Sequence, residues 1–80
     1  MANRLILKER RGYPWGKVEA TIRWRGGGFS KVWVDSQGRG EFSGTGFIDH
    51  VIVAGENIHD VHPLKVDGRT SVVVQSNRNH

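Results

Sequence analysis

The sequence predicts a small all-β protein, an antiparallel β-sandwich of about seven strands that forms a single domain over residues 1–80. Three observations favour this fold class. The apolar residues are mainly Val, Ile, Phe and Trp, which are strand formers. No window repeats apolar residues at helical spacing for more than one turn. Glycine-containing turn sequences recur about every 10–12 residues, a spacing typical of a sandwich or a small barrel.

Seven strands are expected between these turns, and residues 17–25 give the clearest pattern. Apolar and polar residues alternate there, which gives the strand one dry face and one wet face. The expected dry face consists of Val18, Ala20, Ile22 and Trp24. The ends of the chain, residues 1–3 and 76–80, are expected to be frayed. The expected strands are 4–9, 17–25, 30–35, 40–43, 46–53, 57–61 and 70–76.

The second and third expected strands should form a hairpin around the three glycines at 26–28. Their dry faces match only when the numbers of paired residues sum to an even value. A sum of 56 places Arg23 opposite Trp33, and a sum of 54 places Thr21 opposite Trp33. In both registers the side chain of Trp33 points outward.

The fifth expected strand does not alternate cleanly. Strict alternation would bury Asp49 on the same face as Phe47, Val51 and Val53, and burial of an unpaired carboxylate is costly. A β-bulge at Asp49–His50 would turn these two polar residues outward and keep the three apolar residues inside. Alternatively, both faces of this strand are covered.

Composition and charge restrict the class of protein further. With no cysteine, the chain has no disulfide and no thiolate metal site, so its stability must come from its apolar core or from self-association. No apolar stretch is long enough for a membrane-spanning helix or a signal peptide, which predicts a soluble, cytoplasmic protein. Residues 1–39 carry a net charge of +6 and residues 40–80 carry −2. This asymmetry favours an acidic partner, although solubility alone also requires net charge.

A turn in the first half of the chain carries a resemblance to a known family. Residues 32–39, Val-Trp-Val-Asp-Ser-Gln-Gly-Arg, are followed by Phe42. We expect Asp35 to accept backbone hydrogen bonds, Gly38 to adopt a positive φ and Phe42 to enter the core. The segment is similar to the "TDSxGxF" turn of the transthyretin-like and carboxypeptidase-regulatory-like β-sandwiches, with Val34 in place of the usual threonine and no Gly-Tyr ending. The resemblance implies a seven-stranded sandwich with a non-enzymatic accessory or adhesion-like role, and it assigns no functional residue.

The histidines provide the candidate metal ligands. His59, Asp60 and His62 could present two imidazoles and a carboxylate, with His50 as a further ligand, but zinc needs three or four converging ligands. Exposed loop histidines are the alternative interpretation. No strand–turn–helix elbow surrounds a serine nucleophile, and the glycines at 26–28 lack the Lys-Ser/Thr of a phosphate loop. We therefore expect no enzyme, no metal and no cofactor, and a metal- or carboxylate-dependent enzyme at these four residues is the third hypothesis.

The most informative residues are aromatic and basic. On an exposed surface such side chains stack bases and hold phosphates, and they are also enriched at protein-binding hot spots. Trp33 beside Arg23 could equally be a cation–π pair without any ligand. We expect a non-catalytic binding or assembly module that contacts a protein partner or another copy of itself; the alternative is a small β domain that binds nucleic acid. No membrane partner is expected. The expected binding residues are Tyr13, Trp15, Arg23, Arg25, Lys31 and Trp33.

Overall fold

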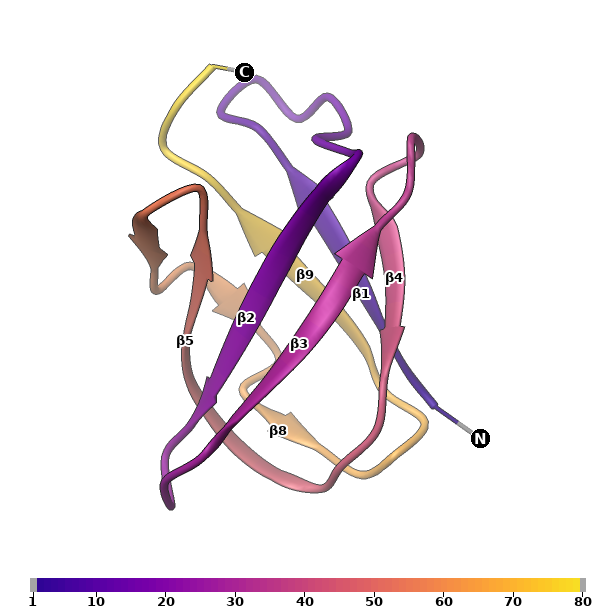
Figure 1. The fold of residues 1–80 in the computed structure, drawn as a ribbon, viewed down its shortest axis with the longest axis vertical. Coiled ribbons are helices and arrows are strands. Elements are labelled where there is room, and N and C mark those ends of the chain that lie inside the picture. The colour runs from indigo at the N-terminus through magenta and orange to yellow at the C-terminus, as the bar shows by residue number, and fades with distance from the viewer. Residues whose placement is uncertain (1, 80) are drawn as a thin grey trace.

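A computed structural model describes residues 2–79, and this part of the chain forms nine β-strands and no helix. The strands are β1 (Asn3–Lys8), β2 (Val18–Trp24), β3 (Phe29–Val34), β4 (Arg39–Phe42), β5 (Gly46–Val53), β6 (Glu56–Ile58), β7 (Val61–His62), β8 (Lys65–Val66) and β9 (Ser71–Gln75). One sheet has the strand order β4-β1-β9-β7 and the other β3-β2-β5-β6, with β8 paired to β5. Figure 1 shows β2 and β3 lying across β1 and β9 as two layers. The predicted all-β sandwich is confirmed.

The core lies between the two sheets and consists mainly of β-branched side chains. Of the predicted dry face of β2, Ala20 and Ile22 are fully buried, while Val18 and Trp24 are partly buried at the edge of the core. β9 contributes alternate residues in the same way. The buried apolar residues are Leu5, Leu7, Ala20, Ile22, Val32, Val34, Phe42, Ile48, Val51, Val53, Ile58, Val61, Val66, Val72 and Val74.

One strand pair differs from the predicted antiparallel arrangement. β1 and β9 run parallel, from Arg4 opposite Ser71 to Lys8 opposite Gln75. A parallel pair needs a long crossover connection. Here the other sheet provides that connection, because β2, β3, β5 and β6 lie between β1 and β9 in the sequence.

The β2–β3 hairpin has a register that the sequence did not predict. Trp33 lies opposite Glu19 and Arg23 lies opposite Phe29, so paired residue numbers sum to 52 rather than 54 or 56. Main-chain hydrogen bonds at the tip centre the turn on residue 26 instead of residue 27 or 28. Because 52 is also an even sum, Trp33 still points outward, as predicted.

The predicted bulge is present in β5, but it orients one aromatic residue differently. Two consecutive residues of β2 pair with His50 and Ile48, so Asp49 is the additional residue and its side chain is exposed. Ile48 is buried and Phe47 is 45% exposed, so the prediction that Phe47 points inward is wrong. One inserted residue shifts the alternation by one position, and a single bulge therefore cannot bury residues 47 and 51 on the same face.

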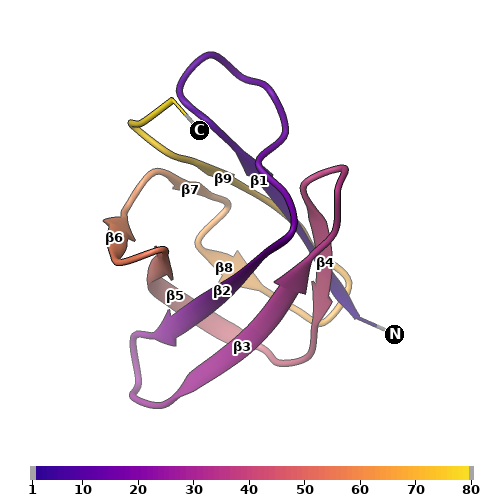
Figure 2. The ribbon, with the colours of Figure 1, turned by 45° about the horizontal axis from the view of Figure 1, so that its top comes forward.

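The segment predicted as one strand over 57–61 is divided between the two sheets. Ile58 pairs with Val51 in one sheet, and Val61 pairs with Val74 in the other. Figure 2 shows the chain passing from β6 to β7 at the side of the sandwich. The short strand β8 was not predicted, since two residues are too few to show a period. No helix in the described part of the chain is long and apolar enough to cross a membrane.

Both expected frayed ends contain a residue that is buried and hydrogen-bonded. The Asn3 amide nitrogen donates to the Gly44 carbonyl at 2.9 Å, and its carbonyl oxygen accepts from the main-chain N–H groups of Gly68 and Thr70. Ser76 is 1% exposed and hydrogen-bonded through its main chain and its hydroxyl. Fraying is therefore a wrong prediction for these two residues, and residues 1 and 80 lie outside the described residues.

The turn at residues 35–39 has the predicted construction. The Asp35 carboxylate accepts hydrogen bonds from the main-chain N–H groups of Gln37 and Arg39, at 2.9 and 3.1 Å. Gly38 has a φ of 76°, and Phe42 is buried. At this turn the chain passes from β3 in one sheet to β4 in the other.

Candidate functional site

The outer surface of the β3-β2-β5-β6 sheet carries aromatic and basic side chains in cross-strand rows. In one row Phe29, Arg23 and His50 are neighbours on three adjacent strands. In the next row Phe47 of β5 lies opposite Lys65 of β8. This surface, called the basic face below, consists of Arg23, Arg25, Phe29, Lys31, Trp33, Phe47 and Lys65.

Cations lie against two of the exposed rings of the basic face. The Arg25 guanidinium carbon lies 4.8 Å from the centre of the Phe47 ring, and the Lys65 ammonium lies 5.8 Å from the same ring. The Arg23 guanidinium carbon lies 6.0 Å from the Phe29 ring centre. Such contacts hold the long side chains over the rings while the donor groups remain in solvent.

Trp33 lies at the other end of the basic face and is 63% exposed. Neither of the two partners considered for Trp33, Arg23 and Thr21, lies opposite it, because the observed register places Glu19 there. Glu19 in turn forms an ion pair with Lys31 at 3.9 Å. This end of the face is therefore electrically balanced, and the unbalanced positive charge lies near Phe29 and Phe47.

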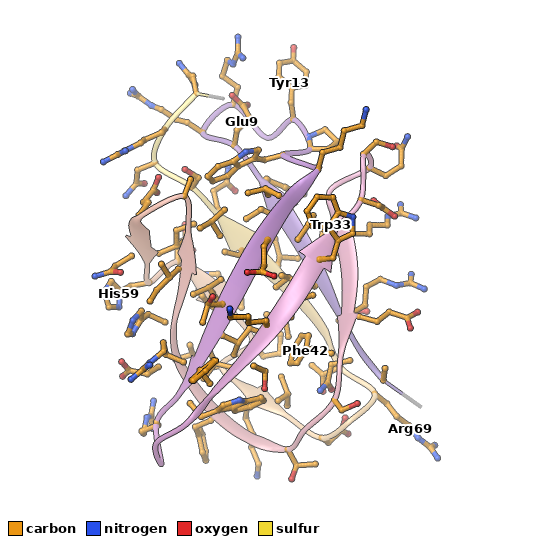
Figure 3. All side chains as sticks on the ribbon, in the orientation of Figure 1. Glu9, Tyr13, Trp33, Phe42, His59 and Arg69 are labelled. Carbon is orange, nitrogen blue, oxygen red and sulfur yellow. The ribbon has the colours of Figure 1, made fainter. Side chains whose placement is uncertain are left out.

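The two predicted residues of the amino-terminal arm do not belong to the basic face. Figure 3 shows Tyr13 in a loop beyond the upper end of the sheets, away from Trp33 on β3. Tyr13 is 62% exposed and has the Arg11 guanidinium 5.2 Å from its ring centre. Trp15 packs partly buried against the core. Of the six predicted binding residues, the structure thus brings together Arg23, Arg25, Lys31 and Trp33.

A buried carboxylate holds the arm loop in place. Glu9 is 1% exposed and accepts hydrogen bonds from the Arg11 main chain and side chain, at 2.7 and 3.0 Å, and from the Tyr13 amide. Burial alone would raise the pKa of Glu9, but the hydrogen bonds from Arg11 and Tyr13 outweigh it and the pKa is lowered. The loop is a folded element, although no pattern in the sequence indicated a buried charge there.

The histidines interact in two separate groups, one at His50 and His59 and the other at His62. The His50 and His59 rings have centres 5.3 Å apart, and His50 Nδ1 lies 2.7 Å from an Asp49 oxygen. That hydrogen bond lowers the pKa of Asp49, against an opposing effect of burial, and the charges of His50, His59 and Arg25 add to it. His62 bonds instead to Asp60 at 2.6 Å. Within residues 2–79, no three His, Asp or Glu side chains form a group that could hold a metal ion.

A groove opens beside the basic face, between the tip of the β2–β3 hairpin and the loop at 43–46. Its volume is about 640 Å³. Trp24 and Phe47 supply its ring surfaces and Arg25 supplies a cation, while Ser30, Ser43 and Thr45 supply hydroxyl groups. The two glycine-rich segments were predicted only as turns, because the sequence does not show that they lie side by side in the fold.

Three members of the basic face were not predicted as binding residues, namely Phe29, Phe47 and Lys65. Phe29 could have been found, because the alternation of Lys31 and Trp33 extends outward by two residues to position 29. Phe47 could be placed on this face only if the shift of alternation across the β5 bulge was known. Lys65 could be placed there only if β8 was known.

Comparison of the chain with protein-family models, with curated proteins and with solved structures found no match. The candidate site therefore has to be interpreted from its own geometry and chemistry.

Proposed function

We propose that this protein is a non-catalytic binding module whose basic face contacts an acidic protein partner. The observation that carries the proposal is the exposure of three large aromatic side chains on one sheet face, with Trp33 63%, Phe29 57% and Phe47 45% exposed. Aromatic residues and arginine are the types most enriched at binding hot spots. An exposed apolar surface rimmed by charge is a common feature of interaction sites on small soluble domains.

The charge of the basic face favours an acidic partner over a second copy of the chain. Four cations lie on it, Arg23, Arg25, Lys31 and Lys65. Two carboxylates lie among them, and both are engaged locally, Glu19 with Lys31 and Asp49 with His50. Two copies that met through this face would bring like charges together, which is unfavourable at an interface.

The proposal is tested with surface variants that leave the core intact. The double variant Phe29→Ala/Trp33→Ala removes two exposed rings of the basic face. Tyr13→Ala is the matched control, because Tyr13 is as exposed as Trp33 but lies off this face. Affinity capture from a lysate, followed by titration of the purified captured protein, should show binding lost in the double variant and retained in Tyr13→Ala. Equal binding by both variants would refute the basic face as the contact surface.

A second candidate function, binding of single-stranded nucleic acid, is favoured by the contacts at Phe29 and Phe47. Each ring has a cation beside it, as in surfaces where bases stack on aromatic rings and arginines hold phosphates. On this hypothesis the logarithm of the affinity for an oligonucleotide falls linearly with the logarithm of salt concentration, by about 0.7 per phosphate contact. Fluorescence anisotropy with a labelled mixed-sequence 15-mer in 20 mM salt decides the matter, because absence of binding there eliminates this candidate.

A further inference from the structure

The groove beside the basic face is built from two segments that are fixed against each other. The hairpin tip presents Trp24 and Arg25, and the loop at 43–46 passes directly over the indole of Trp24. A Cβ atom on Gly44 would lie 3.0 Å from the Trp24 ring. Figure 1 shows both segments at the lower end of the molecule.

Hydrogen bonds hold both walls of the groove in place. The Trp24 indole N–H donates to the Ser30 hydroxyl at 3.0 Å, and the Trp24 ring packs against the buried Phe42 with ring centres 6.1 Å apart. On the other wall, the Gly44 carbonyl accepts from the buried side chain of Asn3. The groove is therefore preformed, which reduces the entropy that a ligand must lose on binding.

The groove contains one cation, and no ion pair holds it. Arg25 is held over Phe47 and forms no ion pair with any carboxylate in residues 2–79. Asp49, whose pKa Arg25 helps to lower, is hydrogen-bonded to His50. A guanidinium stacked on a ring still presents its N–H groups in the plane, in the geometry that matches a carboxylate.

The remaining lining is suited to a hydroxylated ring. The hydroxyls of Ser43 and Thr45 make no hydrogen bond to the described residues, and the Ser30 hydroxyl can still donate after it accepts from Trp24. No carboxylate and no imidazole lines the groove. The volume of about 640 Å³ is within the usual range of small-molecule sites.

From this combination we propose that the groove binds a hexuronic acid, either free or as a residue of an acidic glycan. Arg25 pairs with the carboxylate, the rings of Trp24 and Phe47 contact the C–H face of the sugar, and the serine and threonine hydroxyls bond to the sugar hydroxyls. The groove shares Arg25 and Phe47 with the basic face, but the inference does not depend on the protein partner proposed above, because Phe29 and Trp33, the residues that test that partner, lie outside the groove.

The test is an NMR titration of the isotope-labelled full chain with four probes, which are glucuronate, methyl β-glucuronide, glucose and cyclohexanecarboxylate. We expect shifts confined to the groove and a dissociation constant of about 1 mM for glucuronate, the range for a small ligand of ordinary efficiency. Glucose lacks the carboxylate and cyclohexanecarboxylate lacks the hydroxyls, so both should bind at least about 10-fold more weakly. Binding of the methyl glucuronide identifies a glycan residue as the source, and binding of glucuronate alone identifies the free acid.

Matched variants locate the site. Arg25→Gln should weaken glucuronate binding at least about 10-fold. Arg23→Gln removes the same charge two residues earlier on the basic face, outside the groove, and should change binding less than about twofold. Equal loss in both variants would show only general attraction of an anion, and equal binding of glucose or cyclohexanecarboxylate would show that the carboxylate or the hydroxyls are not recognised. Each of these results, or no shift at about 50 mM glucuronate, overturns the proposal.

Discussion

Two glycines in the loop at 43–46 allow a test of the contact between this loop and the indole of Trp24, which forms the groove. Gly44 and Gly46 have nearly the same main-chain angle, with φ of 130° and 129°. A side chain in this conformation costs on the order of 1–3 kcal/mol at either position. The two sites differ in their surroundings, because a Cβ atom at Gly44 would lie 3.0 and 3.2 Å from two Trp24 ring carbons, whereas one at Gly46 meets nothing within 4 Å.

Gly44→Ala should therefore destabilise the protein more than Gly46→Ala does. Ordinary carbon contacts are about 3.5–4.0 Å, so the added methyl group overlaps Trp24 by about half an ångström. The indole cannot move away freely, because it is hydrogen-bonded to Ser30 and packed on Phe42. Overpacking of this kind costs about 1–3 kcal/mol. Main-chain strain and the unfolded-state effect of replacing glycine with alanine are common to both variants and cancel in the difference.

The difference is measured by urea unfolding followed by circular dichroism, and by melting temperature. For a domain of this size, about 1–3 kcal/mol corresponds to a melting temperature roughly 4–24 °C lower for Gly44→Ala than for Gly46→Ala. Trp24→Phe provides the control, since the shorter ring should remove most of the extra cost of Gly44→Ala in the double variant. If the two alanine variants are equally stable, the loop does not lie on Trp24, and the loop at 43–46 does not form a wall of the groove.

Three further predictions concern the rest of the fold. Asn3→Ala removes three partly buried hydrogen bonds to main-chain groups and should lower the free energy of unfolding by about 2–4 kcal/mol, as measured by urea unfolding, whereas a frayed end would give no change. Ile22→Val should cost about 0.5–1.5 kcal/mol, and the same change at the half-buried Ile52 should cost less than half as much in the same assay. The lowered pKa of Glu9 means that its stabilisation is complete above its ordinary pKa of 4.5 and is lost as the pH falls through the lower folded value. Glu9→Gln should therefore be less stable than wild type at pH 7, and the difference should shrink in melting curves recorded below pH 4.5.

The longer strands were predictable where the sequence alternates between apolar and polar residues. Alternation in the segment containing Ala20 and Ile22 determined both its strand structure and its buried face. The turn at Asp35 was predictable for a similar reason, since one side chain and one glycine within five residues determine it. In both cases the information is local, and the physical rule that applies spans only neighbouring residues.

Local patterns did not determine the register of the β2–β3 hairpin, nor which residues face outward on either side of the β5 bulge. Every even sum satisfies the alternation of β2 and β3, and only the geometry of the turn selects 52. The arrangement of Phe47 depends on one residue inserted at Asp49, and the placement of Lys65 depends on a strand of two residues. These are the features that assemble the basic face, so the sequence predicted part of its composition and not its layout.

The basic face contributes little to the stability of the fold, and this supports a role in binding. Arg23, Arg25 and Lys65 lie on the same face, and repulsion between like charges opposes such an arrangement. The exposed cation–π contacts each contribute only about 0.5–1 kcal/mol of stabilising free energy. Phe29 and Phe47 remain about half exposed and so bury only part of their apolar surface in the fold. An anionic partner would relieve the repulsion and bury the rings at the same time, which the isolated domain cannot do.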